Sequence, residues 1–178
     1  MKRFSLLLLD TGIVIELFQL NIWDGFVAQC DVHLARTVVQ ESKYWEDDLG
    51  QKHPIDLSRY ERDGLITVHD IDVSELDVLT SAFGPDILTK LDPGEAESLA
   101  ILCNSKERFL VSSADGITYR VLGALKCSDQ GISLEETLQA IGLTKQLVYK
   151  FSKAFREKWS RRGFSEGISG LAFTRPDN

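Results

Sequence analysis

Short apolar runs alternate with helical patterns over the first 126 residues, and this alternation limits the fold more than any other feature of the sequence. A short run that is apolar throughout is typical of a strand covered on both faces. The predicted strands are Phe4–Leu9, Val32–Arg36, Leu65–His69 and Phe109–Ser112. Strands that alternate with helices favour βαβ units. The sequence therefore predicts an α/β fold in three layers, with helices around a central, mostly parallel sheet.

Capping boxes mark several helix starts, because a short polar side chain before the helix is followed three residues later by Glu or Gln. The clearest is Asp92, followed by Pro93 and Glu95, which predicts a helix to about Asn104. Two further boxes are Thr37 with Gln40, and Ser133 with Glu136. The other helical patterns are Ile13–Leu20, Trp23–Gln29, Ser74–Phe83, Asp115–Lys126 and a basic helix over Lys145–Arg161. The charged residues 46–48, with Gly50 and Pro54, are expected to close the helix that Thr37 opens.

The size and the cysteine content favour a reduced, cytoplasmic protein. A chain of 178 residues suits one globular domain that needs neither disulfide nor structural zinc to fold. Its cysteines are odd in number and far apart, and have no metal-ligand spacing: Cys30, Cys103 and Cys127. The apolar run Phe4–Leu9 ends at Asp10, which is too early for a secretory signal. No stretch approaches the roughly 20 apolar residues of a membrane span, so no membrane association is expected.

Charge is distributed unevenly along the chain. The net charge is −7, but residues 142–163 alone carry +6, which leaves −13 on the remainder. A basic segment on an acidic body indicates either a polyanion contact or a solvated helix face. Lys150, Lys153 and Arg156 are the candidate RNA-binding residues. The segment Ser133–Trp159 also faintly resembles a helix-turn-helix, which leaves open a nucleic-acid binding module that uses this basic helix.

Acidic residues follow the predicted strands at the places where an open parallel sheet forms its functional crevice. They are Asp10 after the first strand, Glu41 after the second, Glu95 and Glu97 in the helix before the fourth, and Asp115 after the fourth. Converging carboxylates repel one another unless a cation neutralises them. Oxygen ligands suit Mg²⁺ or Mn²⁺, and such a site suits phosphodiester hydrolysis.

Each acid also has a structural interpretation. Asp10 and Asp115 could cap helices, and Glu41 could favour a helix N-terminus. Glu95 and Glu97 flank the apolar stripe of their helix on opposite sides, so one crevice should receive only one of them well. Because Glu95 already serves the capping box, Glu97 is the preferred ligand and Glu95 the substitute.

Four blocks, taken in order, resemble one known family. They are LLLLDTGIVIEL, RTVVQES, LDPGEAESLAIL and FLVSSAD. Their order and placement are similar to those of the PIN domain, a metal-dependent nuclease fold found in toxin–antitoxin ribonucleases and RNA-processing enzymes. The resemblance covers residues 2–125 and implies a PIN-like domain over residues 1–127, with a C-terminal helical extension over 128–178.

The resemblance implies an endoribonuclease that uses Mg²⁺ or Mn²⁺. Asp10 and Asp115 would be direct metal ligands, with Glu41 and Glu97 completing the catalytic cluster. The hydroxyls of Thr11, Ser112 and Ser113 would hydrogen-bond these acids. Two departures are the Glu residues at a helix position where family members often have Asp, and Gly116 where many have a further acid, which puts a second metal position in doubt. An antitoxin and a homodimer are expected partners by the same resemblance, and a PIN-like scaffold without catalysis is the alternative.

Overall fold

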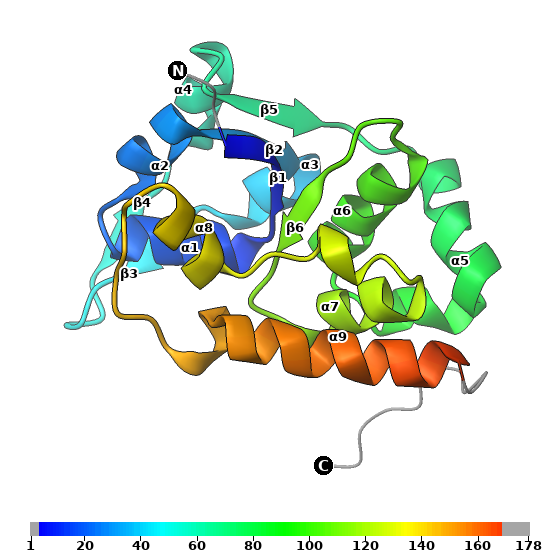
Figure 1. Cartoon of the computed structure of the whole chain (residues 1–178). Helices are drawn as coiled ribbons and strands as arrows, with labels where there is room; N and C mark the ends of the chain where they lie inside the picture. Colours follow the sequence, from blue (N-terminus) through cyan, green and yellow to red (C-terminus); the bar gives the residue numbers. More distant parts are fainter. Residues whose placement is uncertain (1–3, 169–178) are drawn as a thin grey trace.

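Four parallel strands form the centre of the molecule (Figure 1). The computed structural model describes residues 4–168. In spatial order the strands are β5 (Ile66–His69), β2 (Cys30–Ala35), β1 (Phe4–Leu9) and β6 (Leu110–Ser112). Helices flank the sheet, so the prediction of an α/β fold with a parallel sheet is confirmed, and the arrangement is compatible with three layers.

The strands are connected by helices and by one small hairpin. The helices are α1 (Thr11–Gln19), α2 (Trp23–Gln29), α3 (Arg36–Glu41), α4 (Leu57–Arg62), α5 (Asp77–Phe83), α6 (Pro93–Asn104), α7 (Gly116–Ala124), α8 (Leu134–Ala140) and α9 (Lys153–Ile168). Short 3₁₀ turns are η1 (Val73–Leu76), η2 (Pro85–Thr89), η3 (Ser128–Gln130) and η4 (Tyr149–Phe151). The hairpin consists of β3 (Tyr44–Glu46) and β4 (Lys52–Pro54). Within residues 4–168, no helix is long and apolar enough to cross a membrane.

The direction of chain progression reverses between β1 and β6. From β1 the chain moves outward to β2 and then to β5, and it returns to add β6 on the other side of β1. In open parallel sheets the crevice beyond the carboxyl ends of the strands at such a reversal is the usual place for a ligand. The end of β1 and the end of β6 are therefore the first places to look for a site.

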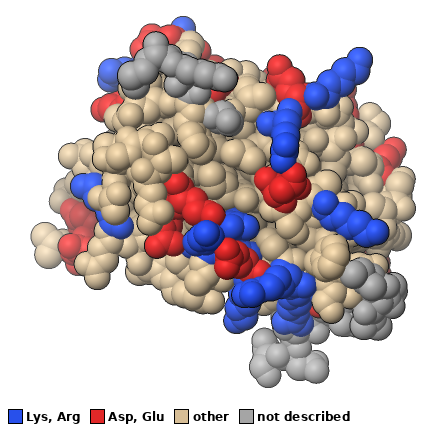
Figure 2. Space-filling view, viewed as in Figure 1, with Lys and Arg blue, Asp and Glu red and all other residues tan. Residues whose placement is uncertain are grey.

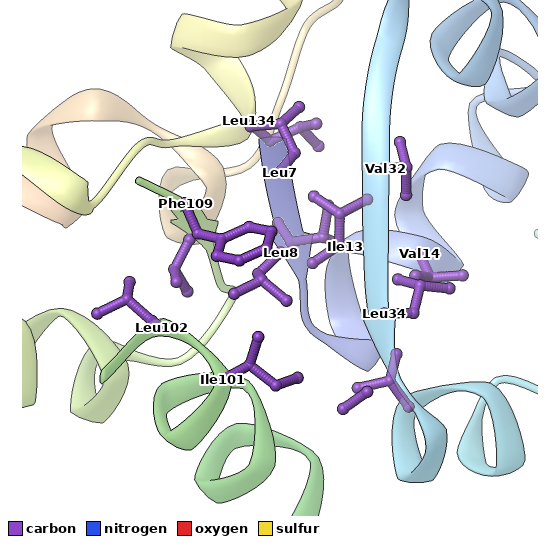
Figure 3. Close-up of a cluster of buried hydrophobic side chains, with 14 of the residues drawn as sticks. Leu7, Leu8, Ile13, Val14, Val32, Leu34, Ile101, Leu102, Phe109 and Leu134 are labelled. Carbon is purple, nitrogen blue, oxygen red and sulfur yellow. The ribbon is translucent and has the colours of Figure 1, made fainter. Parts of the chain in front are cut away.

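One hydrophobic core holds the sheet and its helices together (Figure 3). Leu7 and Leu8 of β1 are fully buried, as is Leu34 of β2. Phe109, just before β6, belongs to the same cluster, and so does Leu134 of α8. Because α8 contributes to this core, the described part of the expected C-terminal extension packs on the body, whereas residues 169–178 of that extension lie outside the described residues.

The segment between β2 and β5 differs from the prediction. The helix starts at Arg36 rather than after a Thr37 cap, so Glu41 is its last residue instead of lying in its first turn. The predicted capping box of Thr37 with Gln40 is wrong, because the Thr37 hydroxyl donates to Glu97 on α6. The residues that were expected only to close this helix form the hairpin, and α4 follows them.

The C-terminal segment also differs. The predicted basic helix over Lys145–Arg161 forms only from Lys153 onward, as α9, and continues to Ile168. The long connection between α8 and α9 is not the short turn of a helix-turn-helix. The other two capping boxes, at the starts of α6 and α8, are confirmed.

Helix α9 packs closely along α7. A Cβ atom at Gly116 would collide with the Trp159 indole, and a Cβ at Gly163 would collide with the main-chain carbonyl of Arg120. The buried Arg120 guanidinium donates to both carboxylate oxygens of Glu166 on α9. Small residues thus let the two backbones approach, and the ion pair fixes their register.

Candidate active site

A pocket of about 210 Å³ lies at the reversal point of the sheet. It is lined by Asp10, Thr11, Gly12, Glu41, Asp92, Gly94, Glu95, Ala114 and Asp115. Four of the five predicted acids are thus brought together, from segments far apart in the sequence. Of the described residues that line this pocket, none is Lys or Arg.

Asp10 is fixed more firmly than the other acids. Its Oδ1 accepts from the main-chain N–H of Ile13 at 2.8 Å, so it caps α1 as the structural interpretation expected. Its Oδ2 accepts from the Ser113 hydroxyl at 2.6 Å and from the N–H of Ala114 at 2.7 Å. Burial raises the pKa of Asp10 even though these donors stabilise its charged form.

Ser113 connects the two aspartates. Its hydroxyl donates to Asp10 and accepts from the N–H of Asp115 at 2.9 Å. Asp115 is exposed and caps α7 through an Oδ1 that accepts from the N–H of Ile117. One hydroxyl therefore sets the relative position of the ends of β1 and β6.

The fully buried Tyr119 positions Ser113 in turn. Its hydroxyl accepts from the N–H of Ser113, and the carbonyl oxygens of Ser113 and Ile132 lie 3.0 Å from it. The sequence prediction missed this residue, and its place in the apolar stripe of α7 is the only signal that the sequence offers.

Thr11 and Glu41 also line the pocket and are hydrogen-bonded to each other. The Thr11 hydroxyl donates to Oε2 of Glu41 at 2.8 Å. Gly94 at the start of α6 permits the approach of α3, because a Cβ there would lie 3.5 Å from the same Glu41 oxygen and 2.9 Å from Val38. Of the three predicted hydroxyls, those of Thr11 and Ser113 donate to pocket acids. Ser112 instead accepts from the main-chain N–H of Asp10 through its carbonyl oxygen.

Glu95 forms the buried floor of the pocket and has a strongly shifted pKa. Its Oε2 accepts from the N–H of Asp92 in the capping box, and the Thr118 hydroxyl lies 3.3 Å from Oε1. Burial, together with the negative charges of Asp115 and Asp10, raises the pKa of Glu95 to about 8. Without a cation this carboxyl is therefore largely protonated at neutral pH.

Glu97 lies outside the pocket, so the preference for Glu97 over Glu95 is wrong. Its carboxylate accepts from the Thr37 hydroxyl at 2.6 Å and from the Thr37 N–H at 3.2 Å. It thereby satisfies the start of α3, whose preceding residue Ala35 has no capping side chain. The prediction that only one of the two glutamates faces the crevice holds, but the capping box places Glu95 there rather than excluding it.

Asp92 is the pocket acid that sequence reasoning did not include. It was recognised only as a helix cap, yet it lines the pocket from the start of α6. The pocket thus lies at the N-termini of α1, α6 and α7. Helix N-termini carry partial positive charge and favour anions, whether carboxylates or a phosphate.

The candidate RNA-binding residues do not line this pocket. Arg156 donates from both Nε and Nη2 to Glu136 on α8, so its guanidinium serves the packing of α8 on α9. Lys153 lies 3.8 Å from Glu157, and Lys150 is exposed beside the Phe151 ring. Of the three, only the two lysines present their charge to solvent.

The acids of the pocket supply only oxygen ligands, the type that hard divalent cations prefer. As their side chains are placed, the described residues contain no group of three or more His, Cys, Asp or Glu that could hold a metal ion. Comparison with known protein families and with curated proteins finds no match for this chain.

Proposed function

We propose that this chain is a PIN-like ribonuclease that hydrolyses RNA phosphodiester bonds with the help of Mg²⁺ or Mn²⁺. The observation that carries the proposal is the convergence of five carboxylates, from the ends of β1, α3 and β6 and the start of α6, on one pocket without a basic lining residue. Capping needs only one acid per helix, so it does not explain why the acids face one another.

The residues of the pocket fit such a cation. Asp10 and Asp115 would hold it, with Glu95 and Glu41 completing the set directly or through water. A carboxylate oxygen that accepts one hydrogen bond keeps a second lone pair, so Oδ1 of Asp10, which accepts from Ile13, and Oε2 of Glu41, which accepts from Thr11, each leave room for a ligand. When bound, the cation lowers the pKa of the attacking water and stabilises the leaving oxygen.

The protein itself supplies position and exclusion. Ser113 and two main-chain N–H groups hold Asp10 still, which keeps one ligand direction constant during the reaction. The N-termini of α1, α6 and α7 carry partial positive charge, which favours a phosphate, although the lining acids would repel that phosphate without a cation. Glu41 and Asp115 are exposed and can adjust to the substrate.

The alternative is a scaffold in which these acids only cap helices. The N-cap bonds of Asp10 to Ile13 and of Asp115 to Ile117 favour it. It does not require the acids of α3 and α6 to face the same pocket, and it predicts no metal-dependent chemistry.

The test is cleavage of a labelled, unstructured RNA by the purified chain in Mn²⁺ or in EDTA. Glu41→Gln is the informative variant, because Gln can still accept the Thr11 hydrogen bond while removing a charge from the pocket. We expect Mn²⁺-dependent cleavage by the wild type, reduced by at least about a hundredfold in the variant at unchanged melting temperature. Cleavage that is equal in EDTA, or equal in the variant, would contradict the proposal.

A further inference from the structure

A second pocket, of about 460 Å³, lies between α9 and Ser128 of η3, and it shares no lining residue with the acidic pocket. Its lining residues are Ser128, Arg156, Glu157, Ser160, Arg161 and Phe164. This volume is within the range of small-molecule sites, which is roughly 300–1,000 Å³. The proposed reaction chemistry uses none of these residues.

Ser160 gives this pocket an unfilled hydrogen-bonding group. The residue is only 5% exposed, and among the described residues its hydroxyl has no hydrogen-bond partner. A buried hydroxyl without a partner is unfavourable, so proteins rarely keep one without a ligand or a water for it. Phosphate oxygens are suitable acceptors for a hydroxyl of this kind.

Two guanidinium groups line the same pocket, but only one of them is uncommitted. Arg156 is held by Glu136 and lies 3.7 Å from Glu157. Arg161 is exposed and has no ion pair or hydrogen bond to any described residue. A guanidinium in this state is well suited to a phosphate, which it can bind through two parallel hydrogen bonds.

Phe164 adds an aromatic surface next to these polar groups. Its side chain is 46% exposed, although it lies one turn of α9 beyond the buried Ser160. An exposed aromatic ring beside an arginine is the combination on which proteins stack the bases of single-stranded nucleic acid. Figure 2 shows further Lys and Arg side chains on the face of the molecule that carries α9.

We propose that this pocket binds one nucleotide of a single-stranded RNA, with the phosphate against Arg161 and the Ser160 hydroxyl and the base against Phe164. The choice of RNA rests on the proposed function. The packing of α9 on α7 supports it, because Trp159 lies against Gly116, next to Asp115, whereas Ser160 and Phe164 lie against Gly123. These glycines are about two turns of α7 apart, or about 10 Å, so one RNA strand can span both regions.

The binding experiment uses the full chain in EDTA, so that RNA is bound but not cleaved. Fluorescence anisotropy of a labelled 12-nucleotide unstructured RNA is measured for Arg161→Gln and for Arg62→Gln, an exposed arginine on α4 that serves as a charge-matched control. We expect Arg161→Gln to weaken binding about fivefold or more and to reduce the slope of log affinity against log salt concentration by about one. Arg62→Gln should have little effect on either quantity. Phe164→Ala should weaken binding about tenfold with an unchanged salt dependence.

Ser160→Ala separates a ligand-binding hydroxyl from a structural one. Because the hydroxyl has no partner in the protein, its removal should leave the melting temperature unchanged or raise it, while RNA affinity falls. Equal losses in Arg161→Gln and Arg62→Gln, or full affinity in Phe164→Ala, would overturn this inference. Absence of cleavage in Mn²⁺ alongside the expected binding losses would instead reject only the ribonuclease proposal.

Discussion

The geometry of the acidic pocket depends on one phenol that does not touch the pocket. Tyr119 holds both main-chain groups of Ser113, and Ser113 holds Asp10 and Asp115. The burial of these groups makes an unmade hydrogen bond costly, because water cannot replace the missing partner. The precision of the carboxylates is therefore set by a residue of α7.

Tyr119→Phe tests this dependence. Losing the hydroxyl leaves the buried N–H of Ser113 without its acceptor, so we expect the free energy of unfolding to fall by about 1–3 kcal/mol. Urea denaturation measures this change. The control is Tyr149→Phe, whose side chain is 56% exposed and which should change stability by less than about 0.5 kcal/mol. Equally small changes in the free energy of unfolding of both variants would show that Tyr119 does not position Ser113.

Which acids the pocket contains was only partly predictable at this scale. Asp10 and Asp115 could be predicted from the sequence because each follows a strand, and the carboxyl ends of parallel strands lie at the same edge of the sheet. Glu95 and Glu97 could not be ranked from the sequence, since both flank the apolar stripe of α6. The choice is made by Thr37 on α3, which binds Glu97 across a contact between helices that are distant in sequence.

At the scale of elements, the close contact of α7 with α9 depends on glycine. Gly163→Ala places a Cβ atom against the Arg120 carbonyl, a main-chain atom that cannot move without displacing α7. We expect unfolding free energy to fall by about 3 kcal/mol or more. Gly25→Ala is the matched control, because its Cβ would make only an ordinary contact with Leu143 at 3.6 Å. Thermal melts that shift equally for the two variants would contradict the packing described.

A histidine pair connects β2 to β5 and makes this edge of the sheet sensitive to acid. His33 Nδ1 and His69 Nε2 share a hydrogen bond of 2.8 Å, and both rings meet the edge or face of Phe109. Burial lowers the pKa of both imidazoles, although the charges of Asp31 and Glu107 act in the opposite direction. The folded protein therefore resists protonation that the unfolded chain accepts below about pH 6.5.

Stability from this pair is present above about pH 6.5 and is lost as the pH falls toward the lowered pKa values. We expect the free energy of unfolding of His69→Gln to fall less than that of the wild type between pH 7 and pH 5.5, measured by urea denaturation at each pH. An unchanged slope in His69→Gln would show that the pair does not contribute.

How well a helix or strand was predicted from the sequence depended on its length and on how local its pattern is. The strands of the sheet and the long helix α6 were evident because their apolar patterns and caps are local. The hairpin was missed because its strands have three residues each and expose most of their side chains. The start of α9 was misplaced because its apolar stripe continues back through η4, whereas the helix itself begins at Lys153, whose N–H donates to Glu135 on α8.

At the scale of the whole molecule, the acidic body and the basic segment predicted from the sequence have separate functions in the proposed account. The carboxylates gather at the reversal point of the sheet, and the basic segment becomes α9, packed on α7. Part of its charge is neutralised internally, since Arg156 pairs with Glu136 and Arg162 with Glu166. The remaining cations are exposed, so a polyanion could reach them. The two interpretations of the basic segment, a polyanion contact and a solvated helix face, therefore concern different residues.

RNA cleavage with Mn²⁺ by Glu95→Gln and by Glu97→Gln tests which acids form the active site. The two glutamates lie on the same helix, but only Glu95 lines the pocket. We expect Glu95→Gln to reduce cleavage by at least about a hundredfold at nearly unchanged stability, because this carboxyl is already largely neutral without a cation. Glu97→Gln should keep near-wild-type cleavage. A large loss in Glu97→Gln at unchanged stability, with full activity in Glu95→Gln, would contradict the assignment of the active site.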